Sequence, residues 1–337
     1  MSDPGPAAAP VGVSIVLPVL NEERHLAEAV KRLLRQDYPG QFEIVLALGP
    51  SRDRTQEIAA ELVESDSRVR TVPNPSGRTP EAMNRAIAAA RHDIIVRIDG
   101  HSFVPDDYLS TAVAVLQRTE ADNVGGIMAA EGVTEFEKAV ARAMTTKLGV
   151  GAAAFHVGGD EGPALTVYLG CFRRSALDRV GGYDESFTRA QDWEMNHRIR
   201  ATGGVVWFSP QLHVTYRPRP TLRALARQYF EYGQWRREVS RVHRGTLSPR
   251  YLAPPGAVLG FVIGLVLGLC GLAFGSRWLL LGWLAPAGYL ALVVVGSVLN
   301  ARRLSFRSLL ALPVVFATMH GAWGIGFLTS RRRTRVA

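Results

Sequence analysis

The chain of 337 residues is 47% hydrophobic, which suits one large domain with an appendage better than a single minimal domain. Its net charge of +9 averages two unlike parts, because residues 1–210 carry an acidic excess whereas residues 211–337 contain 17 arginines and two glutamates. Since these arginines alternate with long apolar runs, the composition favours a membrane with anionic lipid and argues against a nucleic-acid partner. Cys171 and Cys270 fit no metal-binding spacing, so we expect a reducing compartment without disulfides.

The first predicted elements form an α/β domain over residues 13–215. Residues 1–12 lack the basic region and apolar core of a signal peptide, so they predict a disordered lead. Four short runs rich in β-branched residues, separated by helical patterns, indicate βαβ units and a mainly parallel sheet. The runs are VSIVLPV at 13–19, FEIVLAL at 42–48, VRTVPN at 69–74 and DIIVRID at 93–99.

Helix-start signals place three helices between these strands. Asn21 is a candidate cap for the first helix, Asp53 and Gln56 form a candidate cap for the second, and Pro80 stands at the first position of the third. In a parallel sheet of this kind, ligands bind beyond the carboxyl ends of the strands. The segments at those ends are 18–22, 49–53, 74–78 and 99–102.

The residue types at these strand ends suit a nucleotide-sugar. The chain has no G-x-G-x-x-G fingerprint after the first strand and no Walker A sequence, which disfavours a dinucleotide-dependent dehydrogenase and an NTPase. Asp99 offers a hard oxygen ligand for Mg²⁺ or Mn²⁺, and His101, two residues later on the same side of an extended segment, would favour Mn²⁺. A capping aspartate and a surface histidine would explain the same pair.

Three later residues are further candidates. A helix that begins near Gln191 would place Asp192 in its first turn, where exposed N–H groups stabilise an anion, although an ordinary cap has the same pattern. Glu194 could instead orient a neighbouring side chain. His213 follows the strand run GVVWFSP and is a candidate third metal ligand, with a structural histidine as the alternative.

Residues 216–252 predict a basic amphipathic segment on the inner membrane surface. Nine arginines lie between residues 217 and 250, against Glu231 and Glu238. Such a segment would direct its arginines to lipid phosphates and its aromatic side chains to the headgroup level. The aromatic residues are Tyr229, Phe230, Tyr232, Trp235 and Tyr251. A solvated basic helix is the alternative.

Residues 253–330 predict a membrane domain with spans at about 254–275, 278–300 and 308–330. The first two segments are almost uncharged and long enough to cross about 30 Å of hydrocarbon. Buried helices of a soluble protein are the alternative for them. The third contains Pro313 and His320, which weakens its case as a span.

The distribution of arginines around the predicted spans indicates the orientation. Arg302, Arg303 and Arg307 follow the second span, so the positive-inside rule places that loop and the α/β domain in the cytoplasm, at the inner membrane. Three full crossings would put the basic tail 331–337 outside, against the same rule. A re-entrant or interfacial third segment therefore stays open.

Six motifs in order give the sequence a family resemblance. They are SIVLPVLNEE, GPSRDRT, NPSGRTPEAMNRAIAAA, RIDGHS, VGGYDESF and QDWEMNHRIRATGG. Together they resemble the family 2 glycosyltransferases with the GT-A fold over roughly residues 13–240. With the hydrophobic tail, the chain looks most similar to membrane-anchored, succinoglycan-type glucosyltransferases of exopolysaccharide assembly.

The resemblance implies roles for individual residues. Pro18, Asn21 and Glu22 match the family's first-strand motif, and Asp53 matches the aspartate after the second strand; these positions hold the nucleobase. Arg78 and Asn84 match positions near the diphosphate and ribose of the donor. Asp99 matches the first aspartate of the DxD metal motif, which completes the donor-binding set. Asp192 matches the aspartate that deprotonates the acceptor hydroxyl. Implied contacts to acceptor or phosphate are Glu194, Arg217, Arg219, Gln228 and Arg236.

The sequence departs from the family at two places. The usual DDGS cluster is reduced to ALGPS, which leaves Asp53 without its acidic neighbour, and His101 takes the second DxD position. The resemblance implies an inverting transferase, dependent on Mn²⁺ or Mg²⁺, that moves a hexose from a UDP-sugar to a polyprenyl-diphosphate-linked saccharide. A polyprenyl-phosphate sugar synthase and an inactive membrane-tethered scaffold of the same fold are the alternatives.

Overall fold

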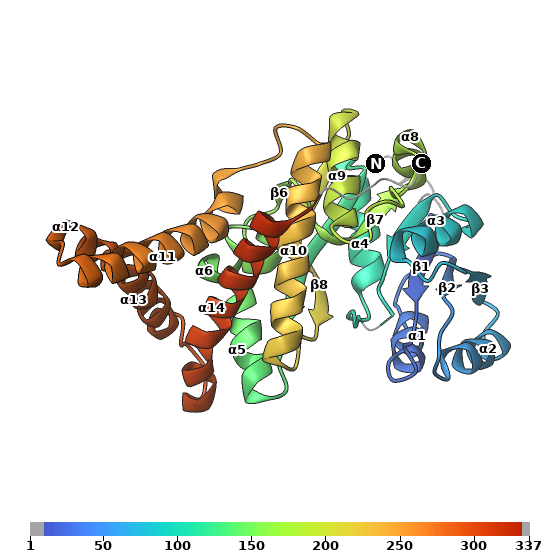
Figure 1. Cartoon of the computed structure of the whole chain (residues 1–337). Coiled ribbons are helices and arrows are strands. Elements are labelled where there is room, and N and C mark those ends of the chain that lie inside the picture. The colour runs from blue at the N-terminus through green and yellow to red at the C-terminus, as the bar shows by residue number, and fades with distance from the viewer. Residues whose placement is uncertain (1–9, 101, 332–337) are drawn as a thin grey trace, which may run out of the picture. The chain divides into compact units, whose positions relative to one another are not determined.

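The computed structural model describes residues 10–100 and 102–331, and the chain divides into two compact units (Figure 1). Unit 1 contains the residues up to Ala129 together with Gly158–Tyr216. Unit 2 contains Ala130–Val157 and the chain from Arg217 onward. The predicted catalytic domain, 13–215, was drawn as one uninterrupted segment, and the structure corrects this by assigning its residues 130–157 to the C-terminal unit.

Unit 1 is built on one eight-stranded sheet with the order β3-β2-β1-β4-β7-β5-β8-β6. Neighbouring strands from β3 to β4 are parallel, whereas β7 runs antiparallel to both β4 and β5, and β6 runs antiparallel to β8. The strands are β1 Val13–Val19, β2 Phe42–Leu48, β3 Val69–Pro73, β4 Ile94–Arg97, β5 Asn123–Ala130, β6 Gly162–Pro163, β7 Tyr168–Arg173 and β8 Val206–Tyr216. The four predicted strands are therefore confirmed as the parallel half of the sheet.

Six helices accompany the sheet. They are α1 Leu26–Leu34, α2 Thr55–Ser65, α3 Thr79–Ala89, α4 Tyr108–Thr119, α8 Arg174–Val180 and α9 Gln191–Ala201. Alternate strand residues such as Ile15 and Ile44 form one buried core with side chains of α1, α2 and α4. Their neighbours Val16 and Val45 point to the opposite face, where α3 contacts β1 and β2. Burial on both faces explains why these strands are continuous apolar runs.

Two predicted helix caps are wrong. The first helix begins at Leu26, because Asn21 adopts a left-handed conformation with φ of 55° and its Oδ1 accepts the backbone N–H of Arg52. The second helix begins at Thr55, and Asp53 accepts that residue's N–H from outside the helix. Both side chains connect loops instead of capping helices. Pro80 at the start of α3 is as predicted.

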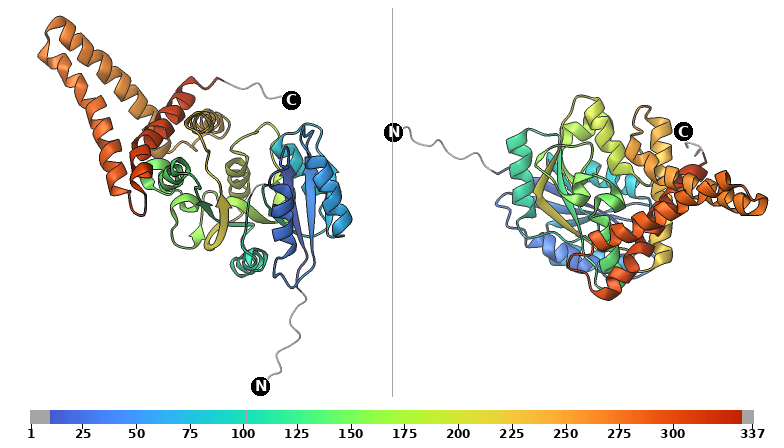
Figure 2. Two further views of the ribbon diagram at one scale, coloured as in Figure 1. Left: turned by 90° about the horizontal axis from the view of Figure 1, so that it is seen from below. Right: turned by 90° about the vertical axis from the view of Figure 1, so that its left-hand side faces the viewer.

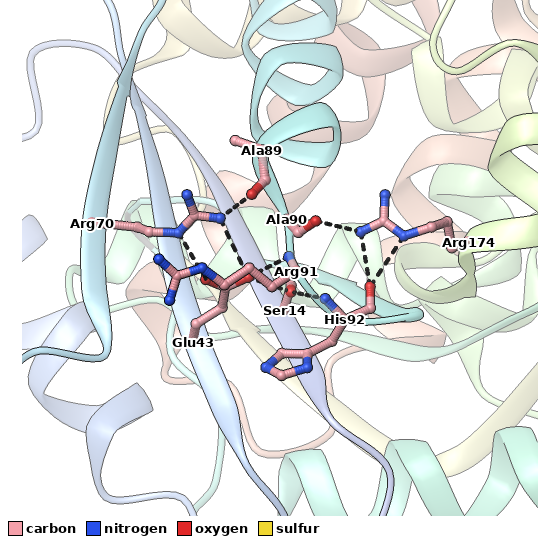
Figure 3. Close-up of polar contacts among 8 residues, drawn as sticks. All are labelled: Ser14, Glu43, Arg70, Ala89, Ala90, Arg91, His92 and Arg174. Carbon is pink, nitrogen blue, oxygen red and sulfur yellow. Dashed lines mark hydrogen bonds and ion pairs between the residues drawn. The ribbon is translucent and has the colours of Figure 1, made fainter.

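A buried polar network ties together the amino ends of the parallel strands (Figure 3). Glu43 is buried, and its carboxylate accepts hydrogen bonds from Ser14 Oγ at 2.7 Å, from Arg70 Nε at 2.7 Å and from the backbone N–H of Arg91 at 2.6 Å. Arg174 donates to carbonyl oxygens at the end of α3 and of His92. The network joins β1, β2, β3 and the loop before β4 at the edge opposite the strand ends predicted to bind ligand.

Replacing Glu43 by alanine is expected to destabilise the protein by about 3 kcal/mol, because it leaves a partly buried guanidinium and a buried hydroxyl without their partner. For a chain of this size the melting temperature should fall by roughly 6–10 °C. Thermal unfolding of the purified protein measures the shift. Glu57→Ala, which removes an exposed ion pair with Arg54, is the matched control and should change stability little. Equal melting temperatures for the two variants would contradict a stabilising role of the network.

Unit 2 is helical. Its elements are α5 Glu135–Met144, α6 Lys147–Val150, α7 Ala154–Val157, α10 Leu222–Val242, α11 Pro249–Phe274, α12 Arg277–Leu280, η1 Leu281–Trp283, α13 Leu284–Leu299 and α14 Phe306–Thr329. The long helices α10, α11 and α5 all pack against α14. Ser308 of α14 donates to the Glu135 carboxylate at 2.8 Å, and Arg142 donates to the carbonyl of Asn300 at 2.7 Å. These contacts explain why residues 130–157 belong to this unit.

The arginine-rich segment 216–252 contains α10, which buries only part of its predicted aromatic face, and the position of the segment at a membrane surface stays a prediction. Tyr229 and Trp235 of α10 are buried, because α10 packs along α14 within unit 2, whereas Phe230 is half-buried and Tyr232 is 40% exposed. Gly233 of α10 and Gly326 of α14 allow the two backbones to approach closely. The boundary with the predicted membrane domain also shifts, since α11 begins at Pro249.

Three helices of unit 2 are long and apolar enough to cross a membrane, namely Pro249–Phe274, Arg277–Leu299 and Phe306–Thr329. The first two lie side by side as a hairpin (Figure 2), in which Gly264 and Gly268 of α11 admit Gly282 and Trp283. The third, α14, is one helix through Pro313 and is the least apolar of the three. The predicted basic tail lies outside the described residues except for Arg331.

Candidate active site

The loops after β1 and β2 are locked together at the carboxyl end of the sheet. The backbone N–H of Asn21 donates to Ser51 Oγ at 3.0 Å, and that of Glu22 donates to Thr55 Oγ1 at 2.8 Å. Asp53 accepts the N–H of Glu23 at 3.2 Å and the Thr55 hydroxyl at 2.5 Å. Hydrogen bonds from Thr55 lower the pKa of Asp53, so its carboxylate is charged at neutral pH. The two predicted base-binding loops therefore form one edge.

The carboxyl end of β4 meets that edge at Gly100. A Cβ atom on Gly100 would lie 3.3 Å from Cγ of Glu22 and 3.7 Å from the carbonyl oxygen of Pro18. Glycine therefore lets the chain after Asp99 pass close to the first loop. The structure thus brings Pro18 and Glu22 next to the segment that carries Asp99, as the sequence predicted. His101 lies outside the described residues.

Arg97, the last residue of β4, joins the two carboxylates expected to carry the chemistry. Its guanidinium is 3% exposed and donates to Asp99 Oδ1 from Nε at 3.2 Å and from Nη2 at 3.0 Å. Its Nη1 donates to Oδ1 of Asp192, in the first turn of α9. The Tyr183 ring lies on the same guanidinium, 5.8 Å from centroid to Cζ. The carboxylates of Asp99 and Asp192, which are far apart in the sequence, are therefore held by one buried cation.

The electrostatics of this cluster suit a general base. Burial raises the pKa of Asp192 to about 6, the negative charge of Asp99 acts in the same direction, and Arg97 opposes both. A carboxylate with this pKa is ionised at neutral pH and still accepts a proton readily. The Asp192 side chain is 25% exposed, so an acceptor hydroxyl can reach it. Burial alone would lower the pKa of Arg97. The negative charges of Asp192 and Asp99 outweigh that effect and raise the pKa above its ordinary value, so the guanidinium stays charged.

The side chains of Asn84 and Arg78, which were predicted to contact the donor, both bind other groups of the protein. Asn84 Nδ2 donates to the carbonyl of Tyr183 at 2.9 Å, and its Oδ1 accepts the N–H of Tyr183 at 2.8 Å. This amide fixes the loop that carries Tyr183 against Arg97. Arg78 forms an ion pair with Glu81 and is about half exposed, so its guanidinium is accessible. Roles of both residues in donor binding stay predictions.

The predicted metal and acceptor residues of unit 1 are not all gathered at Asp99. His213 is exposed within β8 instead of following a strand. Within residues 10–100 and 102–331, no three histidine, cysteine or acidic side chains converge to hold a metal ion. The two hydrogen bonds that Arg97 donates to Asp99 both end on Oδ1, so this contact leaves Oδ2 able to ligate a cation. Glu194 is buried and pairs with Arg198 through two contacts of 2.7 Å.

The remaining predicted contacts belong to unit 2. Arg217 donates to the carbonyl of Glu131 at 3.0 Å, and Arg219 is exposed. Gln228 is buried and donates to the Tyr232 hydroxyl at 2.9 Å. Arg236 is also buried and donates to the carbonyl of Thr246 at 2.6 Å.

Comparison with known proteins assigns the family. Residues 14–181 match the sequence model of Glycosyl transferase family 2. The chain is 33% identical to the succinoglycan biosynthesis protein ExoA of Rhizobium meliloti (strain 1021) over 330 residues, which is 95% of this chain and 96% of that protein. The chain belongs to glycosyl transferase family 2. It is therefore a glycosyltransferase, as predicted, and its fold class is confirmed.

The chain is also similar to a second curated protein and to a solved structure. The dolichyl N-acetyl-α-D-glucosaminyl phosphate 3-β-D-2,3-diacetamido-2,3-dideoxy-β-D-glucuronosyltransferase of Methanococcus voltae is 23% identical, over 66% of this chain and 71% of that protein. The mannosyltransferase PcManGT from Pyrobaculum calidifontis, solved with GDP-Man and Mn²⁺, is 20% identical with a TM-score of 0.59, over 95% of this chain and 86% of that one. The structural match shows that the GT-A fold is shared.

Sequence reasoning missed Arg97 and Tyr183 as members of the site. Arg97 alternates with Asp99 at the end of a buried strand, and a charged residue in such a run signals a buried partner. The partner's identity depends on the fold, because Asp192 lies on a helix far along the chain. Tyr183 gave no local signal beyond its place in VGGYDESF.

Proposed function

We propose that the chain transfers a hexose from a nucleotide-sugar, a UDP-hexose, to a polyprenyl-diphosphate-linked saccharide, with inversion at the anomeric carbon. The observation that carries the proposal is the cluster of Asp192, Arg97 and Asp99 at the carboxyl end of β4. The rigid edge formed by the loops with Glu22 and Asp53 is the proposed site of the base and ribose.

The reaction follows from the charges of the cluster. Asp192 takes the proton of the acceptor hydroxyl, the acceptor oxygen bonds to the anomeric carbon, and the bond from that carbon to the diphosphate breaks. Arg97 orients Asp192 and neutralises Asp99 before the donor binds. Asp99, through Oδ2, and His101 are the residues that would hold Mn²⁺ or Mg²⁺. When bound, such a cation would stabilise the negative charge of the departing nucleoside diphosphate.

The acceptor and the location are proposed on separate grounds. The succinoglycan relative supports a role in exopolysaccharide or cell-envelope glycan synthesis, and the Methanococcus voltae relative is named for a lipid-phosphate-linked sugar acceptor. The apolar helices of unit 2 would keep the enzyme at the membrane where such an acceptor resides. Arg302, Arg303 and Arg307 support a cytoplasmic location of the catalytic unit.

A screen of nucleotide-sugars tests the proposal. Purified full-length protein is incubated with each donor, a membrane lipid extract and Mn²⁺ or Mg²⁺, while nucleoside diphosphate release is followed. We expect one donor to be consumed, with release that requires both the lipid extract and the cation. Asp99→Asn should abolish this release, whereas Asp93→Asn, at the exposed position just before β4, should not. Release by no donor under any condition would contradict the proposal.

A further inference from the structure

The side-chain amide of Asn84, on α3, uses both of its N–H hydrogens within the protein. Nδ2 donates to the carbonyl oxygen of Tyr183 at 2.9 Å and to Oε1 of Glu185 at 3.0 Å, and Oδ1 accepts the N–H of Tyr183 at 2.8 Å. An asparagine amide has only two hydrogens to donate. In this arrangement, Asn84 has none left for the diphosphate or the ribose of a donor.

The loop after α8 accepts this amide in one orientation. Because Asn84 meets both the N–H and the C=O of Tyr183, exchanging its nitrogen and oxygen would set donor against donor and acceptor against acceptor. Gly182 precedes Tyr183 with φ of 72°, and a Cβ atom there would lie 2.7 Å from Oδ1 of Asn84. Glycine at this position therefore serves both the left-handed backbone and the contact with Asn84.

Tyr183 connects this amide to the charges at the carboxyl end of β4. It is 2% exposed, and its ring lies on the guanidinium of Arg97. The phenol also interacts electrostatically with Asp192 and Asp99, and because burial raises the pKa of Tyr183, it stays neutral. A neutral aromatic ring supports a guanidinium through its negative face and adds no charge that competes for the carboxylates. The position of Tyr183 therefore helps to set where Arg97 holds Asp192.

We propose that Asn84 is a positioning residue for the catalytic base and not a contact to the donor. Through Tyr183, it keeps the guanidinium of Arg97 at the place from which it binds Asp192. The role of Asp192 as the base comes from the proposed function. The resemblance implies a donor contact for Asn84, but its amide would have to release the loop to bind a diphosphate.

Kinetics and equilibrium binding together test this assignment on the purified full-length protein. Asn84→Ala should lower kcat by about tenfold or more, because a small displacement of a catalytic group has an effect of this size. The donor KM, and the Kd of UDP measured by calorimetry with Mn²⁺, should change less than about twofold, which also shows that the variant is folded. In the Asp192→Asn background, Asn84→Ala should have no further effect, since the base through which it acts is already absent.

Two adjacent glycines provide matched variants. Gly181 and Gly182 share a φ of 72°, so an alanine introduces similar backbone strain at either position. Only at Gly182 does the added Cβ meet Asn84, because no described atom lies within 4 Å of a Cβ placed on Gly181. We expect Gly182→Ala to lower kcat as Asn84→Ala does, and Gly181→Ala to keep the wild-type kcat.

The contrary results are distinct from one another. A Kd for UDP that rises about tenfold in Asn84→Ala, with kcat unchanged, would overturn the assignment and make Asn84 a donor contact. Equal losses of kcat from Asn84→Ala in the wild-type and Asp192→Asn backgrounds would also overturn it, by showing an effect that does not pass through the base. If Asp192→Asn alone keeps wild-type activity, the proposed function fails and the assignment falls with it.

Discussion

Asp192→Asn is expected to lower kcat for hexose transfer by about 10²–10⁴-fold while changing the KM of the donor little. Asparagine has the same shape and can still accept the hydrogen bond from Arg97, but it cannot take a proton from the acceptor hydroxyl. The loss should therefore appear in the chemical step and not in folding or donor binding. Initial rates of nucleoside diphosphate release, measured at saturating donor and acceptor, give the two constants.

The pH dependence of the wild-type enzyme provides an independent check on this role. Burial raises the pKa of Asp192 to about 6, and the base works only when deprotonated, so kcat/KM should be maximal above pH 7 and decline as pH falls through about 6. The residual rate of Asp192→Asn should lack this decline. Asp178→Asn, an exposed helical aspartate in α8, is the matched control. A rate for Asp192→Asn close to wild type would mean that the nucleophile needs no base, as for a lipid phosphate.

Arg97→Met is expected to lower activity by about 10²-fold and to destabilise the protein by about 3 kcal/mol. The substitution leaves Asp99 and Asp192 near each other without the buried cation that pairs with both. Because Arg97 opposes the rise in the pKa of Asp192, its removal should also move the acidic limb of the pH–rate profile to higher pH. Rate profiles from pH 5 to pH 9, together with thermal unfolding, measure the effects.

The pH shift distinguishes positioning of the base from a purely structural role. Arg97→Lys keeps the charge without the fork and should restore part of the activity and most of the pH profile. Arg85→Met, an exposed arginine on α3, should match wild type in every measurement. A destabilised Arg97→Met enzyme with an unchanged acidic limb would refute the electrostatic role assigned to Arg97.

The parallel half of the sheet was predictable because its signals are local. Strands buried on both faces must be continuous apolar runs, and β1 and β2 fall on the predicted runs, residue for residue. The antiparallel strands carry weaker signals. In β5, two glycines interrupt the run, because a side chain at Gly126 would collide with the backbone of Leu212 in β8. That requirement arises only in the folded sheet.

Long-range pairing limited what could be predicted of the site and of the units. The roles of Asp99 and Asp192 came from motifs, but the guanidinium that joins them is set by contacts between residues 95 positions apart. Likewise, the assignment of residues 130–157 to unit 2 depends on Glu135 meeting Ser308, which lies 173 positions later. Asn21 and Asp53 satisfied the local rules for helix caps, yet each bonds the neighbouring loop instead.

The central claim is that a neutral sugar hydroxyl, activated by Asp192, attacks the donor. The most direct measurement is the identity of the lipid product formed from an isotopically labelled nucleotide-sugar, a membrane lipid extract and either wild-type or Asp192→Asn enzyme, determined by mass spectrometry. We expect the labelled hexose on a polyprenyl diphosphate that already carries sugar, with at least 100-fold less product from Asp192→Asn. A single labelled hexose on a polyprenyl monophosphate, formed equally by both enzymes, would contradict the claim.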